Sequence, residues 1–318
     1  MSKPVRSLVT LLLLVGLSCA LALPAAALFG RSKEEPPAPA GAPVAEAFTL
    51  ITYRDVAVTA NFSATDPQGD PVTFRITKEP ARGRIDFASE GSAAFTYVPY
   101  EGKTGKDSFT FVAEDPSGNV SRPVTVKVRI VKPRTAVTYA DLTDHPAQKA
   151  AIALAERGLF VGERLGETWF FRPDAAVSRA EFLALAMDAV GHDDRPEVER
   201  TGFADDDAVA AWARPYVAGA LRTGAVQGRA TGPAGAEFAP AATITRAEAV
   251  VLLDRLLPAD PVPCGAPEDG PDAPVWARQS AVDLTEAGVL WPGEDLSAGL
   301  TRADAATLLL RALEAQGL

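Results

Sequence analysis

Residues 245–256 read TRAEAVVLLDRL, and two related strings stand at residues 178–189 (SRAEFLALAMDA) and 301–312 (TRADAATLLLRA). In each string, apolar residues recur three, six, seven and ten positions after the Arg, which places them on one face of a helix. A Ser or Thr directly before the Arg, with Glu or Asp three residues later, is typical of a capping box at a helix start. The sequence therefore predicts three capped, amphipathic helices.

A second predicted helix precedes each of these strings and ends in glycine, the residue best suited to a left-handed helix stop. The glycine always stands twelve residues after a Pro or Trp, in the pairs Pro146 and Gly158, Trp212 and Gly224, and Trp276 and Gly288. Two of the following loops carry Phe-x-Pro eight residues before the motif Arg, at residues 171–173 and 238–240. The unit of helix, glycine stop, loop and capped helix thus occurs three times.

These units resemble S-layer homology (SLH) repeats, whose pattern runs Phe-x-Asp, Trp-Ala, a glycine-terminated helix, Phe-x-Pro and Thr-Arg-Ala-Glu. The second repeat, 196–259, keeps the whole pattern, the first, 139–192, has Pro in place of Trp, and the third, 263–318, lacks Phe-x-Pro. The resemblance implies an all-α SLH triplet with a pseudo-threefold arrangement. It also implies docking on an acidic, often pyruvate-bearing, secondary cell-wall polysaccharide through motif arginines in grooves between repeats.

The arginine of each string is the residue that local helix chemistry does not explain. Capping accounts for Thr245 and Glu248, whereas a cation in the first turn opposes the helix dipole by roughly 0.3 to 1 kcal/mol. Two interpretations stay open: a seat for an anionic ligand group, or an ion pair with a carboxylate of a neighbouring repeat. The predicted polysaccharide-binding residues are Arg179, Arg246 and Arg302, with Thr245 and Glu248 of the best-matching string. Arg246 ranks first because its repeat keeps the whole pattern.

Two tryptophans and two histidines have competing interpretations. Trp212 and Trp276 are candidates for stacking on a sugar, although a Trp on the first helix of a repeat more often fills a core, which is the favoured interpretation. His145 and His192 have no partner at metal-ligand or triad spacing, so neither a metal site nor a catalytic site can be assembled from them. His145 is expected at a helix N-terminus, and no cofactor is predicted.

Residues 44–133 have a different pattern, with short alternating runs of β-formers. In residues 124–130 (VTVKVRI), the Val and Ile side chains face one way and Thr, Lys and Arg the other. Turn signals separate the runs, as in DPQGD at 66–70 and DPSGN at 115–119, and they predict about seven strands in an all-β sandwich. The stretch resembles bacterial immunoglobulin-like or cadherin-like surface domains, a resemblance that specifies fold far better than function.

Such domains sometimes bind calcium through carboxylates in their turns. The candidate ligands here are Asp66, Asp70, Asp107 and Asp115. Plain turn chemistry is the favoured interpretation, because Asp caps a turn without a metal and no Asp-x-Asp cluster concentrates charge.

The N-terminus reads as an export signal over residues 1–27, with two basic residues, an apolar run and small residues before a cut after Ala27. Residues 28–43 are a Pro/Ala-rich linker. Cleavage would remove Cys19 and leave Cys264 as the single cysteine, with no membrane span in the mature protein. A lipoprotein anchor at Cys19 is the weaker alternative.

The net charge and the absence of catalytic motifs in the sequence exclude some classes of function. The net charge of −10 excludes a nucleic-acid partner, and residues 134–318 carry 16 basic against 28 acidic side chains. No G-x-S-x-G or H-E-x-x-H string marks an enzyme. The multidomain chain is thus predicted to be a secreted, non-enzymatic, S-layer or cell-wall protein displaying an immunoglobulin-like domain. The alternatives are an adhesin whose sandwich binds an unknown ligand and an accessory part of an exported hydrolase system.

Overall fold

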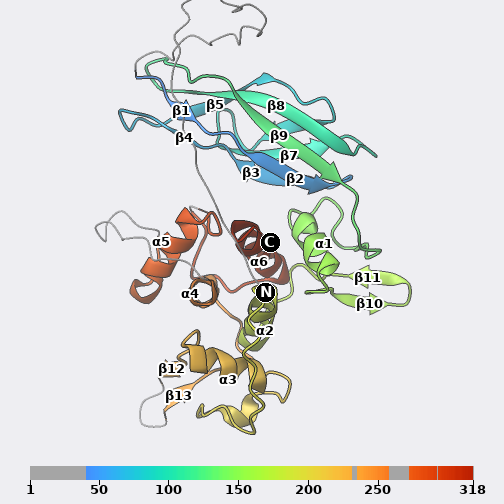
Figure 1. The fold of residues 1–318 in the computed structure, drawn as a ribbon, viewed down its shortest axis with the longest axis vertical. Helices are drawn as coiled ribbons and strands as arrows, with labels where there is room; N and C mark the ends of the chain where they lie inside the picture. The colour runs from blue at the N-terminus through green and yellow to red at the C-terminus, as the bar shows by residue number, and fades with distance from the viewer. Residues whose placement is uncertain (1–40, 231–234, 258–271, 292, 318) are drawn as a thin grey trace, which may run out of the picture. The chain divides into compact units, whose positions relative to one another are not determined.

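The computed structural model describes residues 41–230, 235–257, 272–291 and 293–317. The predicted signal segment, most of the predicted linker and both cysteines lie outside the described residues. Within these limits the chain is multidomain, with a β-rich immunoglobulin-like region followed by a helical region (Figure 1).

The β-rich region contains two sheets and a short extra pair of strands (Figure 1). One sheet has the order β2 (Thr49–Tyr53), β9 (Val124–Val131), β8 (Gly105–Glu114), β5 (Thr73–Lys78), and the other β3 (Val58–Asn61), β7 (Ala94–Pro99), β6 (Gly83–Phe87). β2 and β9 are parallel, and the other pairs are antiparallel. The predicted strand count of seven is exceeded by β1 (Val44–Ala45) and β4 (Ala64–Thr65), two-residue strands that pair with each other.

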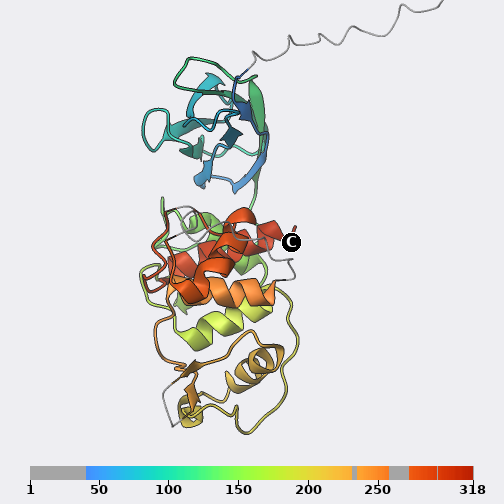
Figure 2. The ribbon, with the colours of Figure 1, turned by 90° about the vertical axis from the view of Figure 1, so that its left-hand side faces the viewer.

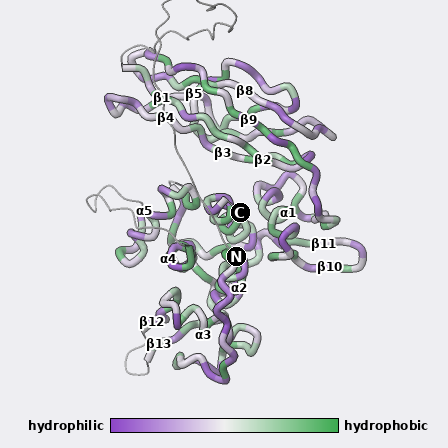
Figure 3. The backbone as a smooth tube through the Cα atoms, in the orientation of Figure 1, coloured by the Kyte–Doolittle hydropathy of each residue, from purple (hydrophilic) through white to green (hydrophobic). Residues whose placement is uncertain are grey.

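Aromatic rings fill the space between the two sheets. Phe62 stacks on Phe95 with ring centroids 4.2 Å apart and meets Phe111 at 4.3 Å. The alternation predicted for β9 is confirmed, because Val126, Val128 and Ile130 are buried while the residues between them are exposed. Figure 3 shows hydrophobic and hydrophilic segments interleaved along the strands, so the sheets bury one face and leave the other to solvent.

The described residues of the helical region form three pairs of helices, one for each predicted repeat. They are α1 (Gln148–Glu156) with α2 (Arg179–Ala189), α3 (Arg214–Thr223) with α4 (Arg246–Leu256), and α5 (Arg278–Glu286) with α6 (Arg302–Ala315). Both side-chain and backbone bonds of the predicted capping box are present at α2, α4 and α6. The three predicted glycine stops are confirmed, with φ between 71° and 79° at Gly158, Gly224 and Gly288.

The expectation of an all-α region was wrong, because two loops form hairpins. β10 (Glu163–Leu165) pairs with β11 (Thr168–Phe170), and β12 (Arg229–Ala230) pairs with β13 (Ala236–Glu237). Each hairpin lies in the long loop between the two helices of its repeat, where backbone groups outside a helix need other partners. Short 3-10 turns add η1 (Asp206–Ala208) and η3 (Val275–Ala277).

A closed ring of backbone hydrogen bonds joins the segments that lead into the three capped helices. Val177 N donates to Leu300 O at 3.0 Å, Leu300 N to Ile244 O at 2.8 Å, and Ile244 N to Val177 O at 3.0 Å. Each of the three side chains is 1% exposed. Beyond the ring, α2 packs against both α4 and α6 (Figure 2), so every repeat contacts the other two.

Candidate functional site

Each motif arginine reaches across to another repeat and donates to a loop carbonyl there. Arg179 Nε donates to Phe238 O at 2.8 Å, Arg246 Nη1 to Asp295 O at 2.9 Å, and Arg302 Nε to Phe171 O at 2.7 Å. The order is cyclic, since the first repeat reaches to the second, the second to the third and the third back to the first. The arginines therefore lie at the joints between repeats.

The Phe-x-Asp aspartates hold two of these acceptor loops in place. Asp205 accepts the backbone N–H groups of Phe238 at 2.8 Å and Ala239 at 2.7 Å, one on each carboxylate oxygen. Asp141 holds residues 171–172 in the same way, at 2.9 and 2.7 Å. Ala239 has φ of 54°, a left-handed conformation that costs a non-glycine residue roughly 1 to 2 kcal/mol. In the sequence, the two aspartates are visible only as the last residue of the Phe-x-Asp element of the repeat pattern, which stands as Tyr-x-Asp in the first repeat.

At the first joint, Arg179 also pairs with the capping glutamate of the second repeat. Its Nη1 lies 3.0 Å from Glu248 Oε1, and the two side chains are only 11% and 15% exposed. Arg229 Nη2 approaches the same oxygen at 2.6 Å. Burial raises the pKa of Glu248, but the hydrogen bonds from Arg229 and Thr245 and the charge of Arg179 outweigh it and hold that pKa below its usual value. Burial lowers the pKa of Arg179.

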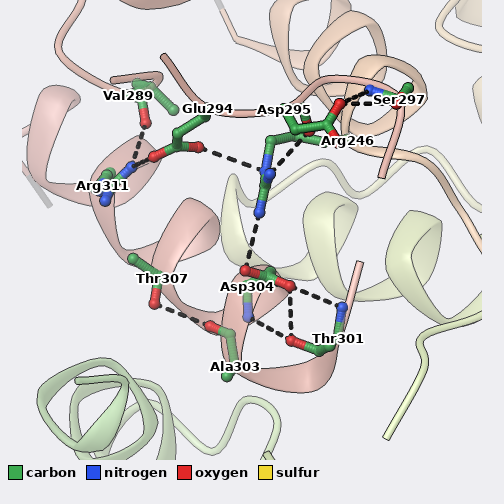
Figure 4. Close-up of polar contacts among 10 residues, drawn as sticks. All are labelled: Arg246, Val289, Glu294, Asp295, Ser297, Thr301, Ala303, Asp304, Thr307 and Arg311. Atoms are coloured by element: carbon green, nitrogen blue, oxygen red, sulfur yellow. Dashed lines mark hydrogen bonds and ion pairs between the residues drawn. The ribbon is translucent and has the colours of Figure 1, made fainter. Parts of the chain in front are cut away.

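At the second joint, Arg246 is held by two carboxylates of the third repeat (Figure 4). Its Nη2 donates to Asp304 Oδ1 at 2.9 Å, and its Nε lies 3.4 Å from Glu294 Oε2. Glu294 also accepts a hydrogen bond from Arg311 Nη1 at 2.7 Å. The ion-pair interpretation thus describes both Arg179 and Arg246.

At the third joint, the arginine is enclosed by aromatic rings instead. The Arg302 guanidinium lies 4.1 Å from the ring centroid of Phe160 and 5.1 Å from that of Phe171. Among the residues that the structure describes, no carboxylate oxygen lies within 4.0 Å of it, and burial lowers its pKa. Cation–π contacts of this kind stabilise a buried guanidinium while leaving donors unused.

Two cavities open at these joints. One, of about 300 Å³, is lined by Arg179, Glu248, Arg229, Arg255 and Trp276. The other, of about 330 Å³, has Arg246 and Arg311 in its wall together with Asp174, Glu294, Asp304 and His145. A cavity of this size with charged walls is large enough for a sugar residue or an anionic group rather than for a macromolecule.

The favoured core interpretation of the two tryptophans was wrong. Trp212 is 52% exposed and Trp276 60% exposed. The alanine that follows each of them, Ala213 or Ala277, is fully buried instead, so the small side chain packs against the core and the indole remains at the surface. The expectation for His145 is confirmed, because its Nδ1 accepts the N–H of Ala147 just ahead of α1.

Three of the four calcium candidates serve as hydrogen-bond acceptors in the sandwich, and the fourth, Asp70, donates its backbone N–H to Asp66 at 3.1 Å. Asp107 accepts from the N–H groups of Ala81 and Arg82 and from the hydroxyl of Tyr97 at 2.9 Å. Asp66 and Asp115 accept N–H groups within their own turns. In the described part of the chain, no three carboxylate, imidazole or thiol groups converge as a metal site would require. These contacts support the turn interpretation over calcium.

Comparison with known proteins agrees with this architecture. The family model for the bacterial Ig domain matches residues 40–129, and that for the S-layer homology domain matches residues 138–183 and 202–250. The chain carries a bacterial Ig domain followed by S-layer homology domains. No helix in the described residues has the length and apolar character needed to cross a bilayer.

Two curated relatives match parts of the SLH-bearing chain. It is 31% identical over 163 residues to a cellulosome-anchoring protein of Acetivibrio thermocellus, covering 49% of this chain and 33% of that protein. It is 36% identical over 89 residues to an amylopullulanase of Thermoanaerobacterium thermosulfurigenes, covering 27% of this chain and 5% of that one. The chain therefore spans a third or less of these relatives. An endo-fucoidan hydrolase structure matches 29% of this chain and 14% of its own at 22% identity with a TM-score of 0.25, too low a similarity to bear on function.

Proposed function

We propose that this chain is a secreted cell-surface protein whose three SLH repeats hold it non-covalently to an acidic cell-wall polysaccharide, with the immunoglobulin-like domain displayed outside. The observation that carries the proposal is the position of the motif arginines: all three lie at joints between repeats. Arg179 and Arg246 also line cavities there. The relative named as a cellulosome-anchoring protein supports an anchoring role.

The repeats are proposed to form one pseudo-threefold body, with boundaries at 139–192, 196–259 and 263–318 after a sandwich at 44–133. The cyclic order of the arginine contacts and the closed ring through Val177, Ile244 and Leu300 support this arrangement. A two-helix unit cannot bury its apolar stripe alone, so each repeat depends on its neighbours. The polymer would then meet a composite surface rather than any single repeat.

An arginine held by one carboxylate still has donors for a ligand, because the guanidinium carries five N–H groups. A carboxylate on the polymer would be recognised through paired N–H···O bonds. The ranking of Arg246 as the most important residue, drawn from its repeat alone, stays a prediction. Thr245 and Glu248 are expected to act indirectly, since the hydrogen bonds between them complete the helix cap.

The proposal is tested by sedimenting the full mature chain with purified cell-wall sacculi. Half of the sacculi are first treated with acid to remove the secondary polysaccharide, and the treated half serves as the control. We expect binding to intact sacculi, loss of binding after treatment, and weakening at high salt because charge pairing is screened. Equal binding to both preparations would contradict recognition of the acidic polymer.

A further inference from the structure

The two cavities occupy equivalent places but differ in charge. At the Arg179 cavity, three arginines face a single carboxylate, that of Glu248. At the Arg246 cavity, two arginines and a histidine face three carboxylates, those of Asp174, Glu294 and Asp304. The first cavity therefore attracts an anion, whereas the second already contains the counter-charges that its arginines need.

Arg255 and Arg311 occupy equivalent positions in the two cavities, because each stands nine positions after the motif Arg of its repeat. Their contacts can therefore be compared directly. Arg311 donates to Glu294 at 2.7 Å and lies 3.6 Å from the Trp291 ring centroid, with 15% of its side chain exposed. Arg255 makes one long contact, 3.5 Å from Nη1 to Ala225 O. Within the described ranges it forms no ion pair, so most of its donors remain for a ligand.

The rims of the cavities differ as well. Trp276 lies in the wall of the Arg179 cavity with 60% of its surface exposed. The position of the same register in the first repeat is Pro146, which lies in the wall of the Arg246 cavity. An exposed indole beside a cationic cavity combines an apolar face for a sugar ring with donors for its acidic group, and a proline supplies no such face.

We propose that the Arg179 cavity is the acidic-sugar subsite of this chain, and that the Arg246 cavity is a structural joint. This inference replaces the sequence-based ranking of Arg246, because the charges of the two cavities favour anion binding at Arg179. Arg255 and Arg229 bind the anionic group of the sugar, and Trp276 stacks on its ring. Arg229 is suited to this because 45% of its side chain is exposed while it pairs with Glu248. This inference rests on the proposed wall anchoring and names the residues through which it works.

The matched variants Arg255→Gln and Arg311→Gln test the division between the cavities. Both remove one charge at the same register, and binding of the full chain to intact sacculi is measured per folded molecule. Loss of a charge-assisted hydrogen bond predicts about tenfold weaker binding for Arg255→Gln and a change below about twofold for Arg311→Gln, which instead lowers the melting temperature. Equal weakening by both, or a larger effect of Arg311→Gln, overturns the inference.

The stacking role of Trp276 is tested with Trp276→Ala and Trp276→Phe on the same sacculi. We expect Ala to weaken binding about tenfold and Phe to restore most of it, because Phe keeps an aromatic ring that can stack on the sugar. Unchanged binding by Trp276→Ala would show that the indole does not contact the sugar and would contradict this role. Failure of the unaltered chain to distinguish intact from acid-treated sacculi would instead overturn the proposed anchoring itself, so the two failures are separable.

Discussion

Replacing Asp205 by Asn should loosen the joint between the first two repeats. The carboxylate accepts two backbone N–H groups, from Phe238 and Ala239, at 2.8 and 2.7 Å. An amide offers one oxygen and turns its NH₂ toward the second N–H. Loss of one hydrogen bond to a charged group costs about 2 kcal/mol. In a helical region of this size, that corresponds to a melting temperature lower by about 4 to 8 °C.

Thermal unfolding of the full chain, followed by its helical circular dichroism, measures this effect. Asp207→Asn is the control, because it removes the same charge from the same turn at an exposed position. A second readout is binding to sacculi, which should also weaken because Phe238 O anchors Arg179 Nε. If Asp205→Asn shifts the transition no more than Asp207→Asn does, the aspartate does not hold the loop and the reasoning fails.

Three further outcomes are expected. Burial raises the pKa of Asp254, which accepts a hydrogen bond from Ser280 Oγ at 2.7 Å. Ionisation of Asp254 therefore destabilises the fold as pH rises through that raised pKa, so Asp254→Asn should increase the melting temperature at neutral pH, and the gain should fade in acid. Burial raises the pKa of Asp107, but hydrogen bonds from Ala81, Arg82, Ser108 and Tyr97 outweigh it and lower the pKa overall. The ionised Asp107 therefore stabilises the sandwich at neutral pH, and this stabilisation is lost below about pH 4. Asp107→Ala should lower the free energy of unfolding in urea by about 2 kcal/mol, whereas the exposed Asp86→Ala should change it little. N-terminal sequencing of secreted protein should begin near Leu28, and thiol titration should find one free cysteine, Cys264; a lipid-modified Cys19 would contradict both.

Local chemistry explains what was predictable from the sequence. The capping boxes, the glycine stops and the alternation in β9 each depend on residues a few positions apart, and all were predicted. The ion-pair partners of Arg179 and Arg246, Glu248 and Asp304, lie 69 and 58 positions further along the chain, where no local rule applies. From the helix dipole alone, removing the motif arginine would stabilise its helix. Because the arginine also pairs with a carboxylate of the next repeat, we expect its removal to lower the stability of the helical region instead.

The tryptophans show a different limit. Hydrophobicity predicts burial on average, but in each Trp-Ala pair the alanine, Ala213 or Ala277, is the buried residue and the tryptophan is exposed. The hairpins were missed because neither loop carries an alternating run long enough to indicate a strand. Which side of a short helix faces inward is decided by the neighbouring repeat, and that neighbour is not visible in a single unit's sequence.

The closed ring through Val177, Ile244 and Leu300 uses one backbone donor and one backbone acceptor from each of three segments. An open solenoid presents unpaired ends, so it can grow by adding units and needs caps to stop. In a ring, each donor is already matched to an acceptor, and a fourth unit could join only by breaking one of those bonds. Removing a unit leaves one donor and one acceptor stranded in an apolar setting, which is costly. Three segments therefore complete this backbone pairing, and loss of any one repeat should destabilise the other two.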